Sequence, residues 1–186
     1  MEITKHLKNL FSILIIYFFG QILEGLCKLT WLNTNALDTI ALATISSQLN
    51  MVFSAFFSIA IVMVLYFVLY NFINLFTSTI SYERLIVALT KTVILYVFFT
   101  VLKICLHLAI LPYLNLEEVD ARSLYDYLIK SDWYFYLTTC NILMYLFGII
   151  VFAYILFKSE KTTNYETCFA TTLCYAICIL LILLNL

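Results

Sequence analysis

Residues 51–76 form an apolar stretch without a single charged side chain. A helix that crosses a bilayer needs about 20 consecutive, mainly apolar residues, and few soluble folds can hide such a stretch. Of all residues, 65% are hydrophobic and only 11% are charged, whereas roughly a quarter is charged in a typical soluble domain. We therefore predict an integral membrane protein for which the lipid bilayer is the main solvent.

Five stretches meet or approach the length of a spanning helix. They cover about 10–29, 51–76, 86–111, 135–157 and 167–186. No internal repeat or low-complexity linker separates them, so we expect a single transmembrane domain over residues 1–186. The predicted fold is all-α, a polytopic transmembrane helical bundle with about five spans.

The basic residues indicate an orientation, because Lys and Arg accumulate in the cytoplasmic loops of membrane proteins. With a cytoplasmic N-terminus, the inner segments would contain Lys5, Lys8, Arg84, Lys158 and Lys161. The outer loops would contain only Arg122 and Lys130, and Trp31 and Trp133 would lie at the outer interface that tryptophan favours. Five crossings place the C-terminus on the outer or lumenal side, and we expect a multi-pass protein of the plasma or inner membrane.

Two further segments show helical periodicity. Residues 35–48 are predicted to be a helical extension or a short interfacial helix. In residues 116–130 the leucines and a valine recur near a 3.6-residue period, and Asn115 with Glu118 three residues later is typical of a helix start. We predict a short amphipathic helix on the outer side, acting either as a lid over helix ends or as a docking element for a partner.

Charged side chains inside the predicted spans are the best functional indicators. Each costs about 2.5–3.5 kcal/mol at the centre of a membrane helix, so each tends to have a partner or a function. Glu24 and Lys28 are four residues apart, in the favourable order for an ion pair, and Lys103 and His107 share a helix face at the same spacing. In the five-span topology all four lie in the outer half of the membrane, so Glu24 could contact Lys103 or His107.

This polar cluster has two interpretations. It could be a site open to the outer side, used for proton coupling or for a polar substrate, since histidine titrates near neutral pH. Alternatively, Lys28 extends to the interface while Glu24 neutralises Lys103, so that the cluster joins two helices. We favour the structural interpretation, because polar pairs commonly hold membrane helices together. Lys91 lies within two turns of Arg84 and is expected to extend to the inner surface.

No motif for catalysis, a cofactor, a metal ion or nucleic acid is recognisable. The six cysteines lie in or beside apolar stretches, form no Cys-x-x-Cys pair, and are predicted to be free thiols that pack as small apolar residues. Cys140 could approach His107 in space, so an intramembrane hydrolase is considered and ranked last. The scattered basic residues do not suggest a nucleic-acid surface.

Residues 81–186 resemble the Yip family, the Ypt-interacting-protein-like membrane proteins. The resemblance rests on the polar and aromatic residues 81–84, on Asn141, Tyr145 and Gly148, and on the short polar turn 158–162 before an alanine-containing last helix. It implies five spans, a cytoplasmic N-terminus and short loops. It also implies an accessory protein that works with other membrane proteins, in bacteria sometimes similar to accessory subunits of ABC-type exporters, and it implies no catalytic residues.

The leading functional hypothesis is therefore a non-enzymatic accessory or scaffold subunit of a membrane protein complex, with transport or export as the process that it would serve. The alternative is a small transporter or channel subunit with a polar site at Glu24, Lys103 and His107. The expected partners are the lipid bilayer and either other membrane protein subunits or further copies of the chain.

Overall fold

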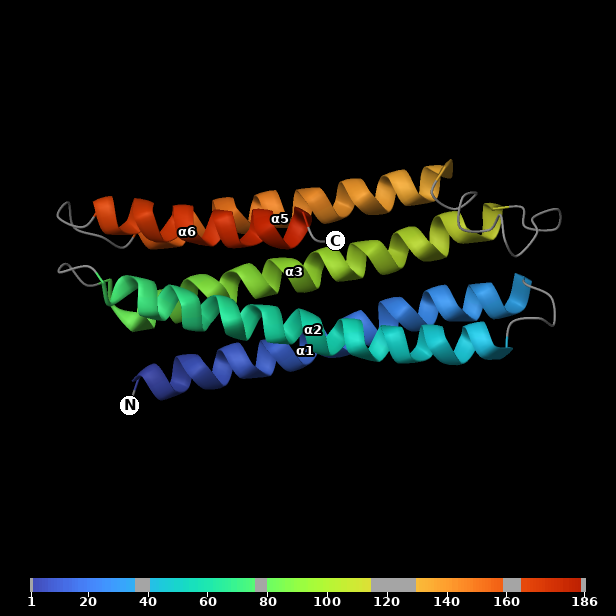
Figure 1. Cartoon of the computed structure of the whole chain (residues 1–186), viewed down its shortest axis with the longest axis horizontal. Helices are drawn as coiled ribbons and strands as arrows, with labels where there is room; N and C mark the ends of the chain where they lie inside the picture. Colours follow the sequence, from blue (N-terminus) through green and yellow to red (C-terminus); the bar gives the residue numbers. More distant parts are fainter. Residues whose placement is uncertain (1, 36–40, 76–79, 115–129, 159–164, 185–186) are drawn as a thin grey trace.

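The computed structural model describes residues 2–35, 41–75, 80–114, 130–158 and 165–184. Their helices are α1 (Glu2–Asn35), α2 (Ala41–Ile73), α3 (Tyr82–Ile110), the 3₁₀ turn η2 (Leu111–Tyr113), α5 (Asp132–Lys158) and α6 (Tyr165–Leu184). Within these ranges there is no strand (Figure 1). The prediction of an all-α bundle is confirmed.

Four helices are long and apolar enough to cross a membrane. They cover Ile3–Thr30, Gln48–Ile73, Tyr82–Tyr113 and Asp132–Lys158, with mean hydropathies of 1.9, 2.6, 2.3 and 2.3. The apolar part of α6, Tyr165–Leu181, is shorter, although all 20 residues of α6 would extend about 30 Å, close to the thickness of the hydrocarbon core. The described residues are thus compatible with an integral membrane protein that has four candidate spanning helices, and the fifth crossing stays a prediction.

The helices lie side by side along the long axis of the molecule, with α3 between the α1–α2 pair and the α5–α6 pair (Figure 1). The most extensive contacts are those of α3 with α1 and with α5. Helices α1 and α3 run in the same direction and α5 runs in the opposite direction (Figure 1). Polar residues on α3 can therefore contact both neighbours.

Several helix boundaries differ from the predicted spans. Helix α1 begins at Glu2 rather than near residue 10, since Glu and Lys have high helix propensity and apolar runs mark only the lipid-facing part of a helix. Helix α3 begins at Tyr82 because Ser81 caps it: the Ser81 hydroxyl accepts a hydrogen bond from the Arg84 amide at 3.4 Å. Within 35–48, the residues from Ala41 onward belong to α2. Residues 115–129, with most of the predicted amphipathic helix, lie outside the described residues.

A close helix contact and an aromatic group hold α3, α5 and α6 together. The Tyr96 hydroxyl on α3 lies 2.7 Å from the Tyr175 hydroxyl on α6, and the Tyr175 ring stacks on Phe152 of α5 with centroids 4.3 Å apart. Gly148 of α5 allows this approach, because a Cβ atom there would lie 2.7 Å from the Tyr96 Oη. All three aromatic side chains are buried, so the middle of the bundle is a packed interior.

Candidate functional site

The four predicted intramembrane residues meet at one carboxylate. Glu24 on α1 is only 5% exposed. Lys28 Nζ lies 3.0 Å from Glu24 Oε1, Lys103 Nζ of α3 lies 2.8 Å from Oε2, and His107 Nε2 of α3 lies 3.5 Å from Oε1. Both i, i+4 pairs lie on helix faces that pack together, so one side chain of α1 can reach two of α3.

Trp133, near the start of α5, extends the cluster to a third helix. Its indole Nε1 lies 2.9 Å from His107 Nδ1. An indole N–H can only donate a hydrogen bond, so His107 Nδ1 is the acceptor and carries no proton. The imidazole proton of neutral His107 then lies on Nε2, facing Glu24 Oε1. The geometry thus selects one histidine tautomer and connects α5, α3 and α1 in a single polar network.

The charges of this network are unequal. One carboxylate faces two ammonium groups, which leaves a formal charge of +1 when His107 is neutral. The Lys28 side chain is 34% exposed, whereas that of Lys103 is 7% exposed. Lys28 can therefore extend to the interface, but Lys103 depends on Glu24. The Lys103 ammonium approaches Oε2 as an ion pair without hydrogen-bond alignment, and this oxygen accepts no hydrogen bond from the described residues.

One helical turn away, a hydrogen bond between uncharged side chains also joins α1 to α3. Gln21 Nε2 donates to Thr100 Oγ1 at 2.9 Å, and the Thr100 hydroxyl donates to the Tyr96 carbonyl at 2.9 Å. Gln21 lies three residues before Glu24, and Thr100 lies three residues before Lys103. The interface between α1 and α3 is therefore polar over about one helical turn, which is typical of hydrogen-bonded contacts between membrane helices.

A cavity of about 280 Å³ lies beside the cluster, between α1 and α2. It is lined by Gln21, Glu24, Gly25, Lys28, Leu29, Asn50, Met51 and Ser54. Lys103 and His107 do not line it, so the cavity opens onto the α1 half of the cluster alone. Of the three residues predicted for a polar transport site, only Glu24 borders this cavity.

The structure does not assemble a Cys–His pair in the described residues. Cys140 is buried with Met144 in an apolar cluster, and both ring nitrogens of His107 are already engaged by Glu24 and Trp133. All six cysteines are free thiols. The described residues contain no group of three or more potential ligands that could hold a metal ion.

Sequence reasoning identified Glu24, Lys28, Lys103 and His107 but missed two participants. The sequence indicates Trp133 only as an interfacial aromatic residue and assigns no role to Thr100, whereas the structure places both in the polar network. The spacing of Thr100 and Lys103, three residues apart on one face, was a signal for Thr100. Nothing in the sequence connects Trp133 to His107, 26 residues earlier.

Comparisons with known protein families, with curated proteins and with solved structures give no match to this chain. The resemblance of residues 81–186 to the Yip family stays a prediction.

Proposed function

We propose that this chain is a non-enzymatic accessory or scaffold subunit of a membrane protein complex. The observation that carries the proposal is the mutual engagement of all four residues of the charge cluster inside the bundle. Glu24 contacts Lys28, Lys103 and His107, and His107 in turn accepts a hydrogen bond from Trp133. Polar groups used in this way join α1, α3 and α5, which supports a structural role.

The energetics of buried charges support the structural role. Removing one partner of a buried pair leaves an uncompensated charge in a medium of low dielectric constant, which is strongly unfavourable. The Lys103 side chain is 7% exposed and does not line the 280 Å³ cavity, so its ammonium group cannot be solvated without separating α1 from α3. The pair therefore favours one arrangement of these helices, as a rigid scaffold requires.

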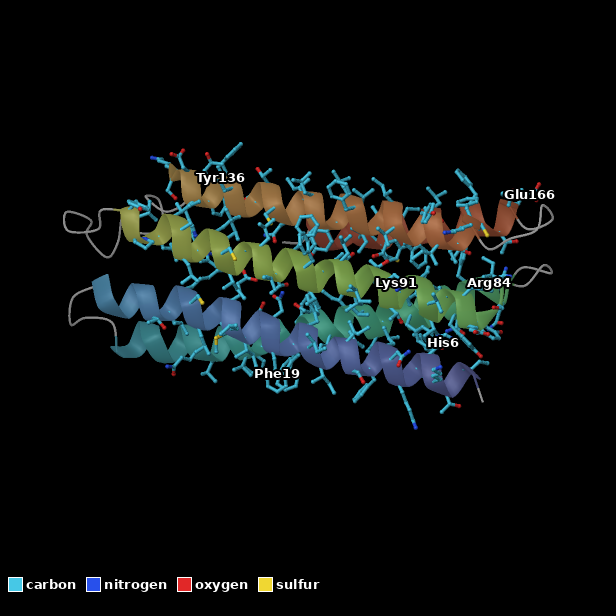
Figure 2. The ribbon with its side chains drawn as sticks, turned by 180° about the vertical axis from the view of Figure 1, so that it is seen from behind. His6, Phe19, Arg84, Lys91, Tyr136 and Glu166 are labelled. Carbon is cyan, nitrogen blue, oxygen red and sulfur yellow. The ribbon has the colours of Figure 1, made fainter. Side chains whose placement is uncertain are left out.

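The proposed topology has a cytoplasmic N-terminus and an outer or lumenal C-terminus. Arg84 and Lys158 lie at the α2–α3 and α5–α6 ends, and Figure 2 places Arg84 at the same end of the bundle as His6 and Glu166. Basic residues gathered at one end agree with a cytoplasmic side there. The partners would be other membrane subunits, or a second copy of the chain, in a plasma or inner membrane.

A small transporter or channel subunit is the alternative, and the 280 Å³ cavity favours it. Glu24, Gln21, Asn50 and Ser54 give that cavity polar groups at membrane depth. Intramembrane ionisable residues that border a cavity commonly mark a substrate or ion path. Lys28, which also borders the cavity, is partly exposed and could change position.

The experiment that tests the proposal is purification of the tagged protein in mild detergent, with Glu24→Gln and Lys103→Met variants alongside the wild type. The scaffold role predicts stable co-purifying membrane subunits that both variants retain whenever they fold. Glu83→Gln is the matched control, since it removes a carboxylate whose contact with His6, at 2.9 Å, lies at the other end of the bundle. A lone, well-folded homo-oligomer whose two cluster variants fold but lose solute flux in liposomes would instead establish the transporter alternative.

A further inference from the structure

A second and larger hollow lies between α3 and α5, away from the charge cluster. Its volume is about 1010 Å³. Its walls are mainly apolar: α3 contributes Val87, Ile94, Leu95 and Phe98, and α5 contributes Val151 and Ile155. Ile94 and Phe98 are 43% and 63% exposed, so the groove is open to whatever surrounds the bundle. In a membrane, the surroundings of such a groove are lipid acyl chains.

One end of this groove is basic. Arg84 and Lys91 line it from α3 and Lys158 lines it from the last turn of α5. Figure 2 shows Arg84 and Lys91 on α3, toward the end of the bundle that also holds His6. Arg84 and Lys91 are seven residues apart, which is two helical turns or about 10 Å on one helix face. The basic side chains therefore form a short row at one end of the groove, which is called the mouth of the groove below.

The charge at the mouth is not neutralised by its one carboxylate. Glu83 also lines the groove, but its Oε1 is 2.9 Å from His6 Nε2. The lining has a formal charge of +2, from three cations and one anion. Neither Lys91 nor Lys158 forms an ion pair with the residues that the structure describes, and Lys158 Nζ lies 5.4 Å from the centre of the Tyr154 ring.

The length of the groove matches one leaflet of a bilayer. Arg84 and Phe98 are fourteen residues apart on α3, a rise of about 21 Å. Half of a bilayer, headgroups included, measures about 20–22 Å. Basic side chains would lie at the level of the headgroups, and apolar walls would extend from there to the midplane. This order matches the headgroup and acyl chains of a single phospholipid. Basic pockets between membrane helices are known to hold anionic headgroups.

We propose that the α3–α5 groove binds one anionic phospholipid from the leaflet at the Arg84 end. The phosphate lies between Lys91 and Lys158, beside Arg84, and an acyl chain runs along Ile94, Leu95 and Val151 toward Phe98. The long lysine stems cover apolar wall while their ammonium groups reach the phosphate. This site is independent of the charge cluster and of the proposed function, since it would serve a scaffold or a transporter subunit equally.

The test is native mass spectrometry of the purified full chain in mild detergent. Phosphatidylglycerol and phosphatidylcholine with identical acyl chains are added in parallel, and the apparent Kd of each is measured. Because each basic residue near an anionic surface contributes about fivefold, Lys91→Gln combined with Lys158→Gln should weaken phosphatidylglycerol binding about 25-fold and leave phosphatidylcholine unchanged. Lys5→Gln with Lys130→Gln removes two exposed charges outside the groove and is the matched control, expected to change neither Kd.

A second variant tests the apolar part of the site. Ile94→Trp fills the groove at an exposed position, keeps every charge, and should weaken both lipids. Helical content by circular dichroism verifies that each variant is folded. Equal affinity of the wild type for the two lipids, or an equal effect of the groove and control lysine pairs, would overturn the proposal. Competition by soluble glycerophosphate as strong as that by the lipid would also overturn it, by showing a phosphate site that needs no acyl chain.

Discussion

Replacing Glu24 with Gln removes the carboxylate on which the polar network converges. The amide has nearly the same shape, so the packing of α1 against α3 is kept while the charge is lost. Lys28 is one-third exposed and can extend toward the interface, but Lys103 is 7% exposed and cannot. The variant therefore leaves one ammonium group buried without its counter-ion.

The size of this effect follows from the cost of an unpaired charge at membrane depth. That cost is about 2.5–3.5 kcal/mol on insertion scales, compared with about 0.6 kcal/mol for an average neutral hydrogen bond between membrane helices. We expect Glu24→Gln to lower the free energy of unfolding by about 2.5–3.5 kcal/mol. Lys103→Met should cost less, because Glu24 keeps its contacts with Lys28 and His107. The double variant should lose less stability than the sum of the two single variants, since it removes both charges of the buried pair.

The assay is a double-mutant cycle in detergent micelles, with unfolding by sodium dodecyl sulfate followed by circular dichroism. We expect Glu24→Gln and Lys103→Met to show a coupling energy of at least about 1.5 kcal/mol. Glu83→Gln is the control: its contact with His6 is 30–38% exposed, and exposed pairs contribute about 0–1 kcal/mol. Additive effects of the two cluster variants, or equal losses for Glu24→Gln and Glu83→Gln, would refute the conclusion that Glu24 and Lys103 form a buried ion pair that joins α1 to α3.

Three further predictions concern other parts of the bundle. Trp133→Phe removes the donor to His107 and should cost about 1 kcal/mol in the same unfolding assay, while Tyr136→Phe, at an exposed position of the same helix, serves as the control; equal losses would contradict the α3–α5 connection. Gly148→Ala places a Cβ 2.7 Å from Tyr96 Oη and 2.8 Å from Tyr96 Cε1 and should destabilise the bundle by about 1–3 kcal/mol; the same substitution should cost less in a Tyr96→Ala background, and an equal cost there would show that the contact is not the cause. Lys8→Cys and Lys130→Cys, each in a cysteine-free background, should react with an impermeant maleimide from opposite sides of the membrane, and labelling from one side would exclude the proposed topology.

The sequence by itself predicts the apolar spans and the spacing of charged residues within each helix, because both depend only on the local segment. The uncharged residues 51–76 predict a spanning helix by themselves, because transfer of apolar surface out of water is additive along a helix. The same local logic identified Glu24 and Lys28 as an i, i+4 pair. It also identified Lys103 and His107 as residues of one helix face, since helical spacing is a property of a single segment.

Only the tertiary structure decided which faces meet. The contact of Glu24 with Lys103, the choice of the His107 tautomer by Trp133, and the bond between Tyr96 and Tyr175 each join residues on different helices. The basic mouth of the groove likewise combines Lys91 of α3 with a residue of α5. Apolar helices in lipid have many packing arrangements of nearly equal free energy, because lipid tails are as apolar as leucine side chains. The rotation and register of each helix are therefore set by a few polar and small residues in three dimensions, and no single segment contains that information.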